Sequence, residues 1–293
     1  MSSTIMITHR TEYRYDRPVI LQPHRMMLRP RDGHDLWVDD ALLTISPTAT
    51  LRWYFDAFGN SIAEASFAGR TDMLLVESQL YLRRYVSDRL VQAEVARVCP
   101  FPFRYTEDDL RDLHPFLGLQ NPEDEQLLSA WLAEKFDIRA PDAVTFLLGL
   151  SDAVHLNLGY SAREEMGTQT AAETIRNGVG TCRDFAFLFM EAARHFGFAA
   201  RFVTGYLDDR QGASPLVKGG GATHAWADVY VPGEGWIEFD PTNRITAGRA
   251  LIRVATTRTP SQASPISGSF IGEGAISSYL SVSVLVREVT ATG

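Results

Sequence analysis

The sequence is poor in cysteine and in lysine. It holds two cysteines, Cys99 and Cys182, and two lysines, so 26 of its 28 basic residues are arginines. Two cysteines cannot build a disulfide framework, and we expect both to remain thiols in a reducing compartment. So few lysines leave little scope for Schiff-base chemistry of the pyridoxal phosphate type.

Long apolar runs are also missing. No stretch approaches the roughly 18 residues that a membrane-spanning helix needs, and residues 1–16 alternate instead of forming the apolar centre of a signal peptide. The net charge of −8 argues against nucleic acid or an anionic membrane as a partner. We therefore expect a cytoplasmic protein with neither partner. Its oligomeric state stays open.

The first part of the chain has the pattern of β-strands. Apolar and polar residues alternate over residues 5–15, and shorter strand-like stretches cover residues 41–45, 51–55 and 74–82. This pattern predicts an N-terminal antiparallel β-domain of sandwich-like form over residues 1–95.

Residues 258–293 are predicted to be a loop followed by a returning strand. The loop, rich in Ser, Pro and Gly, runs to about residue 274, and alternation then marks a strand within residues 276–290. Because a lone strand needs a sheet, we expect it to join the N-terminal β-domain.

Residues 96–257 carry helical patterns and are predicted to form a second domain. The two prolines in residues 99–102 indicate a linker, after which Asn121 is a candidate cap for a helix with an apolar stripe. A buried helix is predicted over residues 142–158. A capping box begins a short helix at residues 170–178, which a glycine ends.

Cys182 is the first candidate for chemistry. It follows the glycine-rich stretch 178–180 and precedes a strong helical stripe, with Thr181 as the predicted N-cap and Asp184 at the third helical position. The backbone dipole and unpaired N–H groups of a first helical turn favour a thiolate. The alternative is a small buried cysteine that only packs at the start of the helix.

A thiolate nucleophile needs an imidazole, and His224 begins the best-placed strand. The strand turns over Pro-Gly-Glu-Gly and returns to Asp240. If Tyr230 faces Trp236, Asp240 lies opposite Trp226, diagonal to His224 on the same face of the hairpin. A loop shorter by one residue would place Asp240 on the opposite face.

Each of these residues also has an explanation that involves no catalysis. His224 could be a polar surface residue and Asp240 a strand-ending turn signal before proline. The six other histidines are interpreted as structural or surface groups, and no second sulfur or paired histidine favours a metal site. Trp226 and Trp236 could wall a cleft or pack in the core. The glycine-rich residues 208–223 could be a mobile flap or an ordinary hairpin tip.

The segments GVGTCRDFAFLFMEAARHFGFAARFVTGYL and ATHAWADVYVPGEGWIEFDPTN resemble the core of bacterial transglutaminase-like proteins. HRTEYRYDRPVILQPHRMMLRPR and YFDAFGN resemble their N-terminal β-domain. The resemblance implies an α+β, papain-like core with the cysteine at the N-terminus of a central helix. It implies a catalytic triad of Cys182, His224 and Asp240. Arg183 departs from the pattern, because many relatives have glutamine there.

The expected function is acyl transfer from a peptide or glutamine-type amide through the Cys182 thiol, without a cofactor. The resemblance implies release of the acyl group to water, as in a protease or amidase, or to an amine, as in a transglutaminase. The Cys182 N–H is the expected oxyanion donor, with Tyr160 a candidate second donor, and Arg183 and Trp226 are candidates for substrate contact. The alternative is a catalytically silent peptide-binding module on the same fold.

Overall fold

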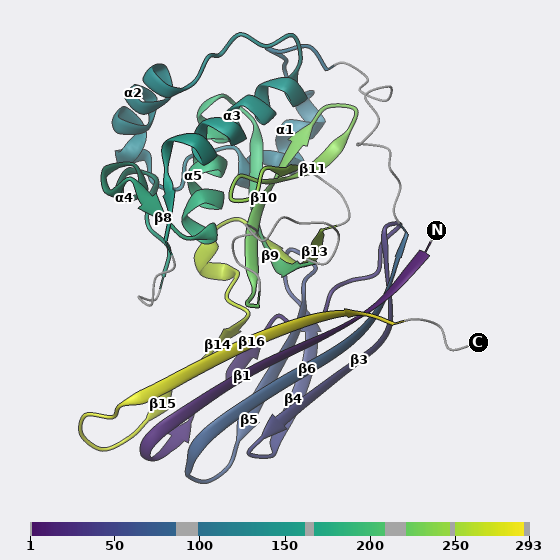
Figure 1. The fold of residues 1–293 in the computed structure, drawn as a ribbon, viewed down its shortest axis with the longest axis vertical. Coiled ribbons are helices and arrows are strands. Elements are labelled where there is room, and N and C mark those ends of the chain that lie inside the picture. Colours follow the sequence, from purple (N-terminus) through teal and green to yellow (C-terminus); the bar gives the residue numbers. More distant parts are fainter. Residues whose placement is uncertain (1, 86–98, 162–166, 209–220, 247–249, 290–293) are drawn as a thin grey trace.

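A computed structural model describes residues 2–85, 99–161, 167–208, 221–246 and 250–289. The fold is mixed α+β, as predicted. The long strands lie in one half of the molecule, and the helices with a further sheet lie in the other (Figure 1). Within the described residues, no helix is long and apolar enough to cross a bilayer.

The β-domain is built from two antiparallel sheets. The first, with strand order β15-β1-β6-β3 and β16 paired to β1, comprises β1 (Ser2–Leu21), β3 (Leu36–Ser46), β6 (Thr71–Tyr85), β15 (Phe270–Ile271) and β16 (Ser278–Glu288). The second, with order β14-β2-β5-β4, comprises β2 (His24–Met26), β4 (Ala49–Phe55), β5 (Ser61–Phe67) and β14 (Ile266–Ser267). Leu74 and Val76 of the first sheet and Ala63 and Ala65 of the second share one buried cluster, so the sheets pack face to face.

Strand β16 lies beside β1, although the two are at opposite ends of the chain. Their antiparallel register runs without a shift from Ile5↔Glu288 to Tyr15↔Ser278. Because β1 also pairs with β6 on its other edge, the first strand is central and the last strand lies at the edge of the sheet. In Figure 1, β16 runs along the side of the β-domain that faces the helices.

The second half contains an antiparallel sheet with strand order β12-β11-β10-β9-β13, covered by helices. Its strands are β9 (Ala199–Leu207), β10 (His224–Val231), β11 (Gly235–Asp240), β12 (Ile245–Thr246) and β13 (Leu251–Thr257). Its helices are α1 (Glu107–Leu113), α2 (Glu125–Lys135), α3 (Ala143–Asn157), α4 (Ala171–Asn177) and α5 (Cys182–His195). A short parallel pair, β7 (Gly159–Tyr160) with β8 (Val179–Gly180), precedes α5.

The predicted helix signals are present in this half. Thr170 accepts a hydrogen bond from the Glu173 N–H in the capping box of α4, and Gly178 ends the helix with a left-handed φ of 66°. Asp142 caps α3 by accepting from the Thr145 N–H. Asn121, by contrast, forms no side-chain cap, and the 3₁₀ helix η3 (Pro122–Asp124) precedes α2.

The chain after residue 258 is more ordered than the predicted loop. It forms the 3₁₀ helix η4 (Pro260–Gln262) and then β14 and β15. Both strands have only two residues and exist through pairing with β2 and β1, which are distant in the sequence. Such short elements carry no periodic pattern of their own, and this is why the composition indicated only a loop.

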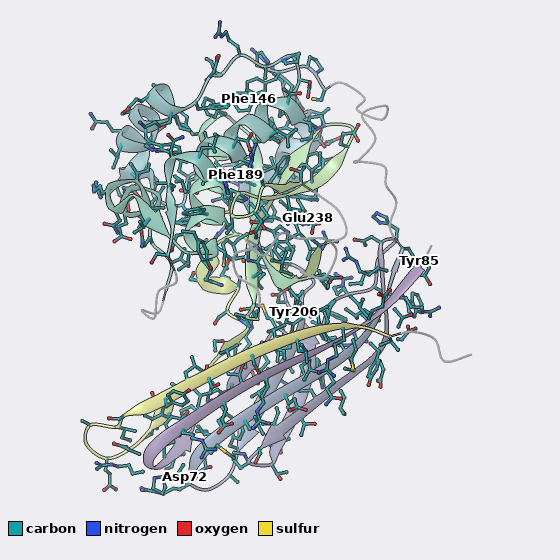
Figure 2. All side chains as sticks on the ribbon, viewed as in Figure 1. Asp72, Tyr85, Phe146, Phe189, Tyr206 and Glu238 are labelled. Atoms are coloured by element: carbon teal, nitrogen blue, oxygen red, sulfur yellow. The ribbon has the colours of Figure 1, made fainter. Side chains whose placement is uncertain are left out.

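An apolar cluster joins the two halves of the molecule. It combines Ile5, Ile7 and Leu80 from the β-domain with Tyr206 of β9 and Ile252 of β13. Tyr206 lies where the two halves meet (Figure 2), and its hydroxyl oxygen is 3.1 Å from Nδ1 of the buried His9. The two sheets are therefore held together by a continuous core.

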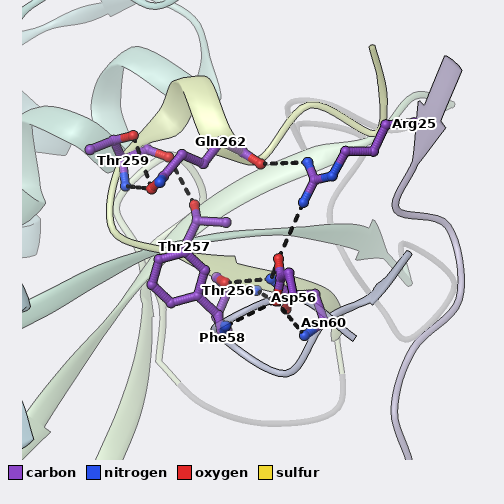
Figure 3. A network of polar contacts seen from close by, with 8 residues as sticks. All are labelled: Arg25, Asp56, Phe58, Asn60, Thr256, Thr257, Thr259 and Gln262. Carbon is purple, nitrogen blue, oxygen red and sulfur yellow. Dashed lines mark hydrogen bonds and ion pairs between the residues drawn. The ribbon is translucent and has the colours of Figure 1, made fainter. Parts of the chain in front are cut away.

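Polar contacts reinforce this junction (Figure 3). The Asn60 side chain donates to the Thr256 carbonyl oxygen over 2.8 Å and accepts from the Thr256 N–H over 2.9 Å. Arg25 donates to Asp56 over 3.2 Å and to the Gln262 carbonyl oxygen over 3.3 Å. The β-domain thus fixes the position of the segment around η4.

A partly buried cluster of charged residues lies near the same junction, beside a cavity of about 460 Å³. Glu238 of β11 pairs in register with Asp228 of β10, which binds Arg201 over 2.8 Å. Arg253 lies 3.5 Å from Glu238. Burial first, and then the charge of Asp228, raise the pKa of Glu238 to about 7, although Arg253 acts against this shift.

This shift predicts a pH-dependent stability. Because the folded state holds the Glu238 proton more tightly than the unfolded state, the free energy of unfolding falls as pH rises from about 4.5 through about 7. One proton sets a slope of at most about 1.4 kcal/mol per pH unit. Urea unfolding of Glu238→Gln should show a smaller decline than the wild type over this range. The exposed Glu134→Gln is the matched control, and parallel curves for all three proteins would contradict the prediction.

Candidate active site

Cys182 is the first residue of α5, the helix packed at the centre of the second half. Asp184 fixes this end of the helix, because its Oδ2 accepts from the Thr181 N–H over 2.8 Å and its Oδ1 accepts from the Gln169 N–H over 2.7 Å. Gly180 allows the backbone before α5 to pass close to Asp184, since a Cβ at this position would lie 2.9 Å from the Asp184 Cβ. The predicted capping box is present. The first N–H groups of α5 have no acceptor within the helix and point out of its N-terminal end.

The β10–β11 hairpin brings His224 and Asp240 together. Tyr230 pairs with Trp236 and Ala227 with Phe239, which is the one of the two registers considered from the sequence that keeps Asp240 on the face of His224. Asp240 then lies diagonal to His224 on one face, and the ring Nε2 is 2.7 Å from the carboxylate Oδ2. Both side chains are fully buried.

The Asp240 carboxylate is held by three groups. Besides His224, the Thr242 N–H donates to Oδ1 over 2.9 Å and the Asn243 amide donates to Oδ2 over 2.9 Å. Burial alone would raise the pKa of Asp240, but the charge of His224 and these hydrogen bonds lower it below its ordinary value. Asp240 is therefore an anion fixed toward the imidazole.

Asn243 and His155 are site residues that the sequence reasoning did not identify. Asn243 lies in the turn three residues after Asp240. His155 of α3 supports that turn from behind, because its Nδ1–H lies 3.1 Å from the carbonyl oxygens of Pro241 and Thr242. The one sequence signal for Asn243 is its position, as a polar residue in the turn directly after the Asp240 carboxylate.

The environment of His224 favours its protonated form. Burial alone would lower its pKa, but Asp240, followed by Cys182, raises it to about 10. Asp240 occupies Nε2, while the Nδ1 atom has no hydrogen-bond partner among the described residues. Cys182 is close enough to affect this ring, so the imidazolium is the favoured form of His224.

Cys182 and His224 line one cavity of about 860 Å³. Its described walls come from the loop before α4, the start of α5, the start of β10 and residues 258–265, with Leu280 of β16 on the side of the β-domain. Cys182 is only 8% exposed, yet it borders this space. The thiol is thus reached through the cavity and not from the open surface.

The remaining predicted residues lie in different surroundings. Arg183 lines the cavity, but its guanidinium donates to the Pro260 carbonyl oxygen over 2.7 Å and so binds α5 to the η4 segment. Burial raises the pKa of Tyr160, and the charges of Cys182 and Asp240 add to the shift. Trp226 is fully buried, donates to Glu238 over 3.3 Å and packs behind His224. Trp236 stacks against Arg201 away from this cavity.

The candidate flap, residues 208–223, lies mostly outside the described residues. Of its described end, Thr223 lines the cavity, and the Gly221 carbonyl oxygen accepts from the Val284 N–H over 2.8 Å. In the described part of the chain, no three His, Cys, Asp or Glu side chains are grouped to hold a metal ion.

Comparisons with known families match two separate parts of the chain. Residues 5–82 match the family described as the bacterial transglutaminase-like N-terminal region, and residues 128–241 match the transglutaminase-like superfamily. The second match contains Cys182, His224 and Asp240.

Similar proteins are known from other bacteria. The uncharacterized protein Rv2569c of Mycobacterium tuberculosis is 29% identical over 277 residues, covering 89% of this chain and 86% of that protein. The uncharacterized protein ML0607 of Mycobacterium leprae is 33% identical over 96 residues, or 33% of this chain and 34% of that protein. A crystal structure described as a "Putative Cysteine Protease" from Cytophaga hutchinsonii has a TM-score of 0.71 at 18% identity, covering 100% of this chain and 93% of that one. It shares the fold.

The site predicts that iodoacetamide alkylates Cys182 well before Cys99. Cys182 lies at a helix N-terminus beside a protonated imidazole, whereas burial and the charges of Asp142 and Glu234 raise the pKa of the Cys99 thiol. Peptide mass spectrometry after brief treatment near neutral pH measures both rates. Equal, slow labelling of the two cysteines would argue against an activated thiol.

The alkylation rate should also depend on Asp240. In Asp240→Asn the pKa of His224 falls, so less imidazolium is present to stabilise the thiolate, and we expect alkylation of Cys182 at pH 7 to slow by about tenfold or more. The matched control is Asp137→Asn, which removes a carboxylate of an exposed pair with Arg139. An unchanged rate in Asp240→Asn, with the control also unchanged, would show that the carboxylate does not act on the thiol.

Proposed function

We propose that this chain, which combines a bacterial transglutaminase-like N-terminal region with a transglutaminase-like core, is a cysteine-dependent acyl-transfer enzyme acting on peptide or glutamine-type amides. The observation that carries the proposal is the fully buried pair of His224 and Asp240, 2.7 Å apart, beside the cavity that Cys182 lines. A buried ion pair is costly to form, and a binding surface does not require one.

In the proposed first step, the Cys182 thiolate attacks the carbonyl carbon of the amide, and a carbon–sulfur bond forms. The imidazolium of His224 then gives its proton to the leaving nitrogen. The carbon–nitrogen bond breaks, which releases an amine, or ammonia from a glutamine side chain, and leaves a thioester. Asp240 holds Nε2, which leaves Nδ1 as the ring nitrogen available for proton transfer.

The tetrahedral oxyanion requires hydrogen-bond donors. We assign this role to the backbone N–H of Cys182, which the helix leaves unpaired, together with the hydroxyl of Tyr160, whose pKa the charges of Cys182 and Asp240 help to raise. The dipole of α5 acts in the same direction, because its positive end points to the reacting atoms.

In the second step, a nucleophile attacks the thioester while His224 accepts its proton and returns it to the Cys182 sulfur. Water as the nucleophile gives hydrolysis, as in a protease or amidase. A primary amine gives a new amide, as in a transglutaminase. The same residues perform both reactions, and the acceptor that enters the cavity decides between them.

The test is a panel of glutamine-containing and γ-glutamyl peptides, incubated with and without an added primary amine. Mass spectrometry of the products distinguishes cleavage, deamidation and amine transfer. Intact-mass analysis should show a hydroxylamine-sensitive acyl adduct on the wild type. We expect Cys182→Ala to lose turnover by on the order of 10³-fold or more, because the covalent route is removed.

Cys99→Ser is the matched control and should retain activity, since Cys99 lies outside the cavity lining. Full turnover by Cys182→Ala would refute the nucleophile assignment. If peptides bind but neither an adduct nor a product forms in the wild type, the chain is instead a silent peptide-binding module.

A further inference from the structure

The outer edge of β16 faces the core half of the molecule. On its inner edge β16 pairs with β1 without a register shift. On its outer edge the Val284 N–H donates to the Gly221 carbonyl oxygen. In an antiparallel ladder the N–H and C=O of one residue point to the same side, and successive residues alternate. The backbone groups of Leu280 and Val282 therefore point to the outer edge, like those of Val284.

This edge has the features of a strand that accepts another strand. The outward backbone groups of Leu280 and Val282 have no hydrogen-bond partner among the described residues. The side chains along it are exposed, to 65% at Tyr279, 49% at Leu280 and 40% at Val282. Exposed strand edges are normally protected by charge, lysine or proline, and residues 278–286 contain none of these.

The same edge borders the candidate active site. Leu280 lines the cavity together with Cys182 and His224. Four residues further along β16, Gly221 crosses the outer edge at Val284 and leads directly into the strand that begins with His224. The exposed part of the edge, near residues 279–282, is therefore continuous with the space in front of the thiol.

We propose that the outer edge of β16, at Leu280 and Val282, binds an extended segment of the substrate as an added strand and presents its amide to Cys182. The inference rests on the proposed acyl transfer and specifies its substrate class: an unfolded or extended stretch of polypeptide, not an isolated glutamine or γ-glutamyl amino acid. Backbone hydrogen bonds supply the affinity, and alternate side chains supply the selectivity.

The charge of the cavity lining indicates which charge the bound segment should carry. Its described lining contains Arg183 and Arg258 but no carboxylate. Arg183 is engaged by Pro260, while the exposed Arg258 side chain forms no hydrogen bond or ion pair with another described residue. A neutral or acidic segment suits this surface, and a lysine-rich one does not.

The test compares two probes that carry the same acyloxymethyl ketone. One is an octapeptide of alternating threonine and valine that ends in glutamine, and the other is a single acylated glutamine. With either probe, the Cys182 sulfur forms a thioether with the methylene carbon and a carboxylate leaves. We expect the octapeptide to label wild-type Cys182 at least about tenfold faster, because only it can pair with β16.

The matched variants are Val282→Pro and Val282→Ala. Proline removes the outward N–H without taking a hydrogen bond from β1, whereas alanine keeps that N–H. Val282→Pro should slow labelling by the octapeptide by about tenfold and leave iodoacetamide and the single-residue probe unaffected. Val282→Ala should stay close to the wild type with both probes.

A second arm leaves the protein unchanged. Octapeptides methylated at one backbone nitrogen at a time should lose labelling at alternate positions only, because a paired strand uses every second N–H on one edge. Equal rates for the two probes, or no effect of Val282→Pro, would overturn the edge proposal while the acyl-transfer proposal stands.

Two other outcomes have different meanings. Failure of every electrophile, iodoacetamide included, to label Cys182 would overturn the proposed function and the edge proposal together. A wild-type dimer that Val282→Pro converts to a monomer, seen by sedimentation, would show that a second copy of the chain occupies the edge and would overturn the substrate proposal alone.

Discussion

The hydrogen bond between His224 and Asp240 constrains the rest of the site. Both side chains are fully buried, and an ionised pair without further partners would be destabilising in such surroundings. The turn after β11 supplies the compensation through the Thr242 N–H and the Asn243 amide, and His155 fixes that turn from α3. The imidazole can therefore face the cavity only when the β10–β11 register, the turn after β11 and the position of α3 are all correct.

The cavity is shared by both halves of the molecule. Residues 258–265 form one wall, and they are held from the β-domain by Arg25 and from α5 by Arg183. Leu280 contributes from the edge of the β-domain sheet. The segment that joins the core to the last strand therefore shapes the space in front of the thiol, and the N-terminal region contributes to the site by fixing that segment.

Much of the site could be predicted because its signals are local. The capping box at Thr181 and Asp184 determines where α5 begins, and the turn between Tyr230 and Trp236 determines which face Asp240 occupies. Asn243 lies only three residues after Asp240 and was missed although its contact is local, whereas Leu280 escaped prediction because it lines the cavity through a contact between distant segments. Likewise, β14 and β15 are two residues long, and only pairing with β2 and β1 makes them strands. Local periodicity contains no information about such partners.

The pairing of the first strand with the last also has a consequence for biosynthesis. As the ribosome makes the chain, β1 and β6 emerge before the core, but the sheet lacks β16 until the core residues between β6 and β16 have also been made. Until then the nascent protein lacks Leu280 and the edge beside the cavity. The wall that Leu280 adds to the thiol pocket is thus completed only after the core has been made, and a translation product truncated before β16 would carry the nucleophile without the strand that borders it.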